Sequence, residues 1–278
     1  MSNGNNQAAK ADTFRILHRG SKVLVLPNAW DVASARIFED AGATAIATTS
    51  AGIAFSLGYP DGERISREEM LTVVARIAAK VKLPVSADVE AGYGNRPEDA
   101  GATAKALIEA GAAGLNLEDG TGDPQRPIAD LNLQLEKIAA VTEVARQAGV
   151  PLVLNARTDI YLLEVGQPET RFDQAMRRLS AFRDAGADCL FLPGIRDLET
   201  IARFVRDLRH PINILAGPGS PSIPELQHLG VARVSIGSGA ARAALGLARR
   251  IAQELFSTGT YESLEGATAG GELNRMMQ

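Results

Sequence analysis

Carboxylate side chains follow several short apolar runs of this sequence, where they could bind a metal ion. Asp88 and Glu90 come directly after the run Pro84–Ala87, and Glu118 follows the next run along the chain. Carboxylates that converge without a lysine are costly unless a cation neutralises them. Their oxygens, with room left for water, suit Mg²⁺ or Mn²⁺. Alternatively, Glu90 and Glu118 pair with Arg157 and loop arginines in a structural network.

Arg157 follows a further apolar run and is the candidate for binding an anion. A guanidinium group binds a carboxylate or a phosphate through two parallel hydrogen bonds. Arg157 could also be the counter-ion of the acid cluster, and the two roles are compatible. The turn Thr49–Gly52 could offer backbone N–H groups to an anion. Gly237–Gly239 resembles a barrel phosphate site, although a tight turn between strand and helix needs glycine in any case.

Other chemistries are excluded by what is missing from these positions. No lysine lies at the C-terminal end of an apolar run, which argues against a Schiff-base aldolase. His18, His210 and His228 are scattered, so a zinc site is not expected. Cys189 lies inside an apolar run and is expected to be a small core residue rather than a nucleophile.

The elements that position these residues repeat along the chain. An alanine-rich amphipathic stretch ends in acid-Ala-Gly-Ala before a short apolar run, at 39–50, 108–119 and 183–194. Glycine ends a helix readily, and a continuous apolar run indicates a parallel strand buried on both faces. The predicted strands are Lys22–Leu26, Thr44–Thr48, Pro84–Ala87, Ala113–Leu117, Pro151–Leu154, Asp188–Leu192, Ile212–Leu215 and Ala232–Ile236.

Eight strands that alternate with helices over about 250 residues predict an α/β fold, a (β/α)₈ TIM-type barrel. A doubly wound open sheet is the alternative, but it usually needs a glycine-rich turn after the first strand, and Leu26–Trp30 is not one. In a barrel the C-terminal ends of the strands meet at one mouth, so the polar residues above are expected to lie together.

Composition limits the remaining classes of function. The 278 residues include 29 basic and 33 acidic ones, for a net charge of −4, and the interspersed signs argue against a nucleic-acid partner. One cysteine excludes a disulfide framework. No apolar run approaches the ~18 residues of a membrane span, and the first residues lack the apolar core of a signal peptide. We therefore expect a cytoplasmic protein with a single domain, 1–278.

Five motifs, in order from about residue 23 to residue 238, resemble the isocitrate lyase/phosphoenolpyruvate mutase superfamily. They are Leu26–Asp31, Thr49–Gly52 followed by Ser56–Asp61, Asp88–Gly94, Gly114–Asp119 and Asn155–Asp159. The resemblance implies a Mg²⁺-dependent (β/α)₈ barrel that acts on 2-oxo acids or on compounds that yield them.

The resemblance also implies roles for individual residues. Asp88 would hold the metal, with Asp61, Glu90 and Glu118 in contact with it mostly through water. Arg157 and the backbone around Ser50 and Ala51 would bind the substrate carboxylate. The residues assigned to substrate binding are Trp30, Thr49, Ser50, Ala51, Asp88 and Arg157, and those assigned to catalysis are Asp61, Glu118 and Arg157. The shared step would form or cleave a bond at C3, with the metal stabilising a pyruvate enolate.

The loop 119–128 departs from the pattern of this superfamily. Isocitrate and methylisocitrate lyases carry a Lys-Lys/Arg-Cys-Gly-His loop whose cysteine acts as an acid, whereas DGTGDPQRPI has no Cys, His or Lys. The Thr/Ser-Asn type of loop usual in phosphonate-processing members is missing too. Three hypotheses follow: a C–C lyase or decarboxylase of a small 2-oxo or 2-hydroxy dicarboxylate, such as oxaloacetate or a methylmalate; a phosphonopyruvate-type P–C mutase or hydrolase; or a 2-oxo acid binding protein without turnover.

The segment 239–278 is expected to be helical and to form an oligomer interface. It contains a long helix at Ala240–Leu255, a shorter one near Tyr261–Glu265 and a loosely structured stretch at Ala267–Gln278. The apolar face of the long helix is wider than one barrel contact requires. Members of the superfamily commonly exchange this helix with a neighbour, so we expect a homotetramer built as a dimer of dimers. Apart from these copies and the small 2-oxo acid substrate, no nucleic-acid or membrane partner is expected.

Overall fold

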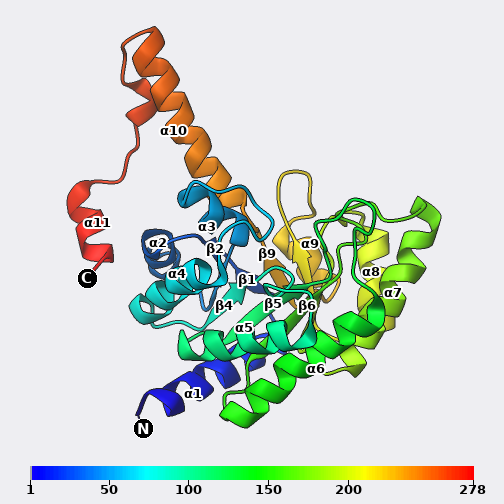
Figure 1. Ribbon diagram of the computed structural model, residues 1–278. Coiled ribbons are helices and arrows are strands. Elements are labelled where there is room, and N and C mark those ends of the chain that lie inside the picture. The colour runs from blue at the N-terminus through cyan, green and yellow to red at the C-terminus, as the bar shows by residue number, and fades with distance from the viewer. Residues whose placement is uncertain (1) are drawn as a thin grey trace.

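A parallel barrel surrounded by helices forms the body of the protein (Figure 1). The computed structural model describes residues 2–278, with side chains from residue 6 onward. The strands are β1 (Leu24–Leu26), β2 (Asn28–Ala29), β3 (Ile46–Thr48), β4 (Val85–Asp88), β5 (Gly114–Glu118), β6 (Val153–Arg157), β7 (Cys189–Phe191), β8 (Ile212–Leu215) and β9 (Arg233–Ser235). The helices are α1 (Ser2–Leu17), α2 (Val32–Asp40), α3 (Ser50–Ser56), α4 (Arg67–Lys80), α5 (Pro97–Glu109), α6 (Leu131–Ala148), α7 (Pro168–Asp184), α8 (Leu198–Leu208), α9 (Ile223–His228), α10 (Gly239–Ser257), the 3₁₀ turn η1 (Glu262–Leu264) and α11 (Gly270–Met276). The predicted barrel is confirmed.

The barrel is closed by a strand that a proline interrupts. All strands are parallel, in the order β1-β9-β8-β7-β6-β5-β4-β3-β2, and Pro27 separates β1 from β2. Proline has no N–H to donate to a neighbouring strand. Asn28 makes the connection instead: its Oδ1 accepts the N–H groups of Ile236 and Gly237, both at 2.9 Å, and its Nδ2 donates to the carbonyl of Thr48 at 2.8 Å. The predicted strand Lys22–Leu26 is therefore the first half of a longer strand.

The ends of the strands decide where the polar residues lie. Ile212–Leu215 is predicted and observed with the same bounds, whereas the strand predicted at Pro151–Leu154, which is β6, begins two residues later and ends three residues later. As a result Asp88, Glu118 and Arg157 are the last residues of β4, β5 and β6 and not the first residues of loops. Regular strand geometry therefore fixes their backbones.

Helix α1, which the sequence did not predict, covers the amino-terminal end of the barrel (Figure 1). The buried residues of this helix, Ala11, Phe14 and His18, recur every three to four residues. Only Phe14 among them is large and apolar, so the sequence shows no clear amphipathic pattern. The Phe14 side chain packs among the interior barrel residues Leu24, Leu26, Ala45, Ala47 and Val153. A Cβ on Gly114 would lie 3.0 Å from the Phe14 ring, so the glycine makes room for it.

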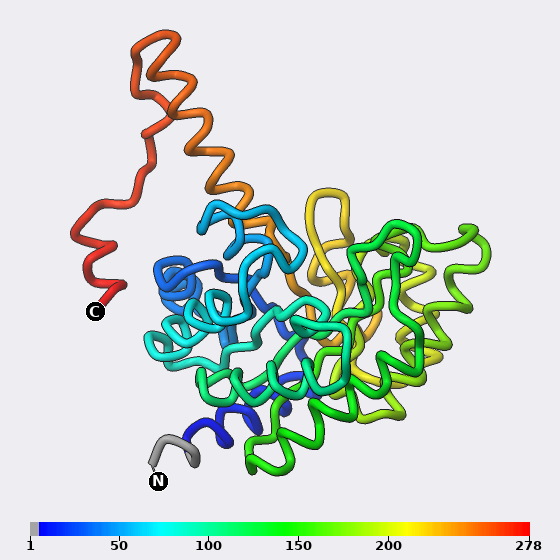
Figure 2. The backbone as a smooth tube through the Cα atoms, viewed as in Figure 1, coloured from blue at the N-terminus to red at the C-terminus, as the bar shows by residue number. Residues whose placement is uncertain are grey.

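Helix α10 projects away from the barrel, and the chain then turns back so that α11 lies against α2 (Figures 1 and 2). The predicted long helix is confirmed, and its Leu245, Leu247, Leu255 and Phe256 side chains are exposed. The expectation that Ala267–Gln278 is loosely structured is wrong at α11. There the Arg36 Nε donates to the carbonyl of Met276 at 2.6 Å, a contact with a distant helix that local sequence does not reveal. No helix within residues 2–278 is both long and apolar enough to cross a bilayer.

Candidate metal and substrate site

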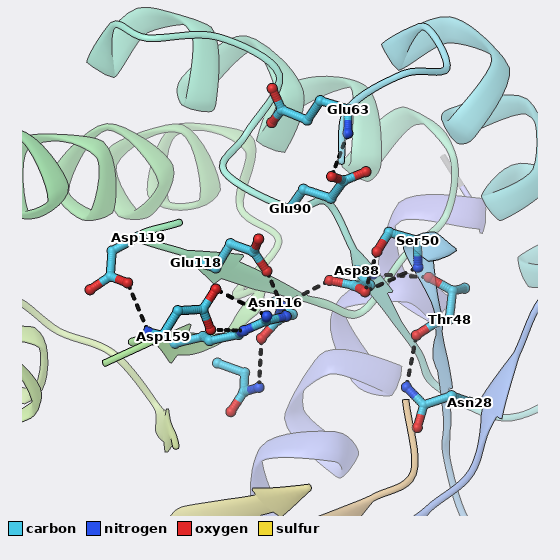
Figure 3. Close-up of polar contacts among 12 residues, drawn as sticks. Asn28, Thr48, Ser50, Glu63, Asp88, Glu90, Asn116, Glu118, Asp119 and Asp159 are labelled. Carbon is cyan, nitrogen blue, oxygen red and sulfur yellow. Dashed lines mark hydrogen bonds and ion pairs between the residues drawn. The ribbon is translucent and has the colours of Figure 1, made fainter. Parts of the chain in front are cut away.

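The carboxyl ends of β4, β5 and β6 bring Asp88, Glu118 and Arg157 to one mouth of the barrel. Figure 3 shows the two acids there together with Glu90. In the register of these strands Asp88 lies opposite Asn116, and Glu118 lies opposite Arg157. The side chains at positions two apart point to the same face of a strand. Asn116 and Glu118 therefore both point toward the interior of the mouth, as Asn155 and Arg157 do on the next strand.

Asp88 is held in one orientation by hydrogen bonds from two neighbouring strand ends (Figure 3). Its Oδ2 accepts the Ser50 N–H at 3.0 Å and the Ser50 hydroxyl at 2.8 Å, and its Oδ1 accepts the Asn116 amide at 2.8 Å. Its backbone N–H donates to the Thr48 hydroxyl at 2.9 Å. The Ser50 N–H, expected to face the substrate, is thus already donated to Asp88, and Ser50 has a positioning role as well.

Two asparagine side chains, linked by hydrogen bonds, support the orientation of Asp88. Asn155 Nδ2 donates to Asn116 Oδ1 at 3.0 Å, and Asn116 in turn donates to Asp88. Both asparagines are buried. They were recognised in the sequence as strand-end residues but were not assigned to the site, and their spacing of two residues from Glu118 and Arg157 is the signal that places them there.

Arg157 is paired with two carboxylates and keeps part of its guanidinium free. Its Nη1 lies 2.6 Å from Glu118 Oε2, while its Nε and Nη2 lie 2.5 and 3.0 Å from the two oxygens of Asp159. Burial alone would lower the pKa of Arg157, but the charges of Glu118 and Asp159 outweigh it and raise the pKa. A guanidinium has five N–H groups, so one on Nη1 and one on Nη2 remain for an anion. The counter-ion role is realised, and the binding role is compatible with it.

The segment after β4 has a strained backbone that a lysine holds in place. Glu90 and Tyr93 both have left-handed φ angles, 51° and 58°, which are unfavourable for residues with a Cβ. The ammonium group of Lys137, which reaches over from α6, donates to the carbonyls of Ala91 and Gly94, both at 2.8 Å. Sequence reasoning missed Lys137 because it lies on a helix, away from every strand end.

The charge of Asp88 affects the pKa values of the remaining acids, Glu90 and Asp61. Glu90 Oε2 accepts the Glu63 N–H at 2.5 Å (Figure 3). Burial first, and then the charges of Asp88 and Asp61, raise the pKa of Glu90 to about 8. Partial desolvation and Asp88 likewise raise the pKa of Asp61. Glu90 and Glu118 were the two acids that could have paired with arginines in a structural network. Among residues 6–278, Glu118 pairs with Arg157, and Glu90 pairs with no arginine.

The donor set fits a hydrated Mg²⁺ ion rather than an ion enclosed by protein. Within residues 6–278 no ion pair involves Asp61, Asp88 or Glu90, so their mutual repulsion is offset only in part, by the more distant charge of Arg157. No three His, Cys, Asp or Glu side chains in that part of the chain converge tightly enough to enclose a metal. Mg²⁺ usually keeps several waters and takes one or two carboxylates together with substrate oxygens. Asp88 as the one direct ligand, with Asp61, Glu90 and Glu118 behind water, matches that preference.

The other residues predicted to bind substrate lie together beside Asp88. Thr49 caps α3, since its hydroxyl accepts the Gly52 N–H at 3.3 Å, and Ser50 and Ala51 form the first turn of this helix. A Cβ on Gly52 would lie 3.0 Å from the Cβ of Trp30 and 3.1 Å from that of Ala241. This close packing joins the half-buried Trp30 to the start of α10. Their roles in binding remain predictions.

The loop that departs from the lyase pattern is anchored by a buried ion pair that sequence reasoning did not find. Arg178 Nε, on α7, lies 2.7 Å from Asp119 Oδ2, and Arg178 Nη2 donates to the carbonyl of Ala129 at 2.9 Å. Asp119 Oδ1 accepts the N–H of Asp159 at 2.9 Å (Figure 3). The Asp119–Arg178 pair therefore connects both ends of the loop to the backbone of Asp159, whose carboxylate orients Arg157.

Comparisons with known proteins agree with this geometry. The family model of phosphoenolpyruvate phosphomutase matches residues 14–256. The 2-methylisocitrate lyase of Escherichia coli K12 is 30% identical over 241 residues, which cover 83% of this chain and 79% of that enzyme. The crystal structure of a Burkholderia cenocepacia J2315 protein, provisionally assigned as a lyase/mutase, has 42% identity and a TM-score of 0.92 and covers 98% of this chain and 96% of that one. Oxaloacetate acetylhydrolase in complex with its product oxalate has 27% identity and a TM-score of 0.86, over 97% and 94% of the two chains.

Proposed function

Because the chain belongs to the phosphoenolpyruvate phosphomutase family, and so to a superfamily of carbon–carbon lyases, mutases and hydrolases, we propose that it is a Mg²⁺-dependent lyase or decarboxylase. Its substrate would be a small 2-oxo or 2-hydroxy dicarboxylic acid that yields a pyruvate-like enolate. One observation carries the proposal: the oriented carboxylate of Asp88 and the free N–H groups of Arg157 face the same mouth. A 2-oxo acid presents the complementary pair of groups, a carboxylate beside a carbonyl oxygen.

Hydrogen bonds within the chain fix the orientation of Asp88 and Arg157 before the substrate binds. Ser50 and Asn116 fix the Asp88 carboxylate, so little reorganisation is needed when it takes up a cation. Glu118 and Asp159 fix the plane of the Arg157 guanidinium, and thereby the orientation of a carboxylate bound to its two free N–H groups. When bound, Mg²⁺ would supply Lewis-acid stabilisation of the negative charge that develops on the 2-oxo oxygen.

The loop 119–128 favours cleavage without a thiol acid. It contains no Cys, His or Lys, so an enolate formed at the mouth would have to take its proton from water or from a carboxyl group. Asp61 and Glu118 are the two assigned to catalysis. Glu118 Oε2 is bonded to Arg157, which leaves Oε1 as the atom that can hold a proton.

A panel of substrates tests the proposal. Oxaloacetate, 2-methylmalate and phosphonopyruvate would each be incubated with the protein and Mg²⁺, and the 2-oxo acid, CO₂ and phosphate products measured. We expect carbon–carbon cleavage that EDTA abolishes and that Mg²⁺ or Mn²⁺ restores. Asp88→Ala should remove the metal response, whereas Asp123→Ala, a carboxylate in the exposed part of the loop, should keep it.

Each other outcome of the panel would overturn part of the proposal. Release of pyruvate and phosphate from phosphonopyruvate alone would identify a P–C hydrolase, and its rearrangement to phosphoenolpyruvate, without release of phosphate, would identify a P–C mutase. Tight binding of 2-oxo acids without turnover would identify a binding protein. Full activity in EDTA would exclude the metal-dependent mechanism.

A further inference from the structure

A hollow of about 350 Å³ lies at the end of the barrel opposite the mouth. Its wall is formed where β1, β8 and β9 begin, by residues 18–23, 209–211 and 230–232, together with Val205 and Gln227. This volume is at the lower end of the range for small-molecule sites. The catalytic mouth uses the other ends of the strands, so the hollow is not part of it.

The lining of the hollow is strongly basic. Arg19, Lys22 and Arg209 contribute three cationic side chains, and His18 and His210 contribute two imidazoles. Among the described residues that line it there is no Asp or Glu, although the chain as a whole carries a net charge of −4. Neither Arg19 nor Arg209 takes part in any ion pair found in residues 6–278. The basic lining is therefore a local feature that composition does not explain.

A further positive charge lies directly behind this wall. Arg233, which follows the lining residue Ala232, is 2% exposed, and its Nε and Nη1 have no hydrogen-bond partner among the described residues. Burial lowers the pKa of Arg233, and the charge of Asp88 opposes this only in part. Burial first, and then the charge of Arg233, lower the pKa of His18 to about 4, so the positive charge of Arg233 reaches a residue that lines the hollow.

The nearby carboxylates are already used elsewhere. Asp184 and Asp207, which act on the lining residues His210 and Arg209, are paired with Arg183 and Arg206. Asp188 influences His18 and His210, but its oxygens lie 2.7 and 3.2 Å from Nε and Nη2 of Arg15, and it also accepts the N–H of Leu154. It is therefore neutralised by Arg15. The buried Nε2 of His18 has no partner among residues 6–278, since only its Nδ1 is bonded, to the carbonyl of Phe14 at 2.8 Å.

We propose that this hollow binds a phosphate group, as inorganic phosphate or as the phosphate of a small monoester. Two guanidinium groups and an ammonium group suit a doubly charged oxyanion with several acceptor oxygens. The hollow is large enough for an organic group beside the phosphate. The bound anion would add to the counter-charge that Asp88 provides for Arg233.

Calorimetric titration of the full-length protein with inorganic phosphate, in EDTA and at fixed ionic strength, tests the proposal. We expect one site, whose Kd rises at least tenfold in Arg19→Gln/Arg209→Gln. Glutamine keeps much of the side-chain length, and both arginines are exposed, so the variant should fold; an unchanged melting temperature in phosphate-free buffer checks this. Lys22→Gln, a separate variant, should also weaken binding.

Two controls distinguish binding in this hollow from a general effect of charge and from binding at the mouth. Arg76→Gln/Arg146→Gln removes the same charge from exposed helix surfaces elsewhere and should leave Kd within about twofold. Arg157→Lys, which alters the anion-binding group of the mouth, should leave Kd unchanged. Equal weakening in both double variants would mean that only overall charge matters. Loss of binding in Arg157→Lys would move the phosphate to the mouth, and no measurable heat at millimolar phosphate would exclude the site; each of these results overturns the proposal. Tighter binding of glycerol 3-phosphate would identify a monoester ligand, and equal binding would identify phosphate itself.

Discussion

Replacing Arg178 with Met should destabilise the protein strongly, although Arg178 contacts neither the metal site nor the proposed substrate. The change removes the 2.7 Å contact with Asp119 and the hydrogen bond to the carbonyl of Ala129, while it keeps an apolar side chain of similar length. Both partners are buried: the Asp119 side chain is 0% exposed and that of Arg178 9%. Removal of one member of a buried pair costs about 3–5 kcal/mol, because the other charge is left without a partner.

The lower part of this range is expected for Arg178→Met. Burial already raises the pKa of Asp119, and Arg178 opposes that shift. Without Arg178 the carboxyl group can take up a proton, which limits the cost of leaving it buried. We therefore expect a loss of about 3 kcal/mol in the free energy of unfolding at neutral pH, measured by urea denaturation.

A double-mutant cycle makes this prediction specific. Asp119→Asn keeps an acceptor for the N–H of Asp159, so Asp119→Asn/Arg178→Met should cost about 2 kcal/mol less than the sum of the single variants. Arg146→Met, which breaks an exposed pair with Glu143, is the control and should cost less than about 1 kcal/mol. A loss for Arg178→Met as small as that of the control, or additive effects in the cycle, would refute the reasoning.

Three further predictions follow from other parts of the structure. Arg157→Lys should raise the KM for any 2-oxo acid substrate at least tenfold, because an ammonium group cannot keep the carboxylate contacts and bind a substrate carboxylate bidentately; an unchanged KM in steady-state kinetics would contradict the binding role. The lowered pKa of His18 means that the unfolded chain takes up a proton below about pH 6.5 whereas the folded protein does so only near pH 4, so stability falls as pH falls through this window. The difference between wild type and His18→Gln in urea denaturation should change by about 3 kcal/mol between pH 7 and pH 4, and a constant difference would show that His18 does not titrate in this way. Light scattering should show a tetramer for the intact chain and a smaller assembly for a chain that ends at Ser238; a monomer of the intact chain at micromolar concentration would exclude an interface on α10.

The barrel could be predicted because its signals are local and repeated. Each glycine-ended helix followed by a continuous apolar run identifies one unit, and a shift of two or three residues in a strand boundary does not alter the topology. Helix α1 could not be predicted in the same way. It is held by Phe14 inside the barrel and by Arg15, which bonds to Asp188 and to the carbonyls of Pro151 and Leu152, and all these partners are distant in sequence.

The candidate site could be predicted only as far as strand ends reveal it. Asp88, Glu118 and Arg157 were expected at one mouth because parallel strands end together. The groups that orient them come from helices: Lys137 on α6 and Arg178 on α7 are separated from the mouth in sequence, and only tertiary packing shows where they point. For the same reason only the structure shows that Arg157→Ala would leave the buried Asp159 and the half-buried Glu118 without this partner, so this variant is expected to lose stability as well as substrate affinity.

The position of Phe14 inside the barrel has a consequence for synthesis of the chain on the ribosome. Helix α1 emerges before every strand of the barrel, but the Val153 side chain that completes the pocket around Phe14 is translated much later. At ordinary elongation rates the interval is roughly ten to thirty seconds. During that time the Phe14 side chain has no complete docking surface and is open to chaperones. A segment made before the barrel is therefore among the last to reach its native contacts, and this end of the barrel is sealed only after β6 has been synthesised.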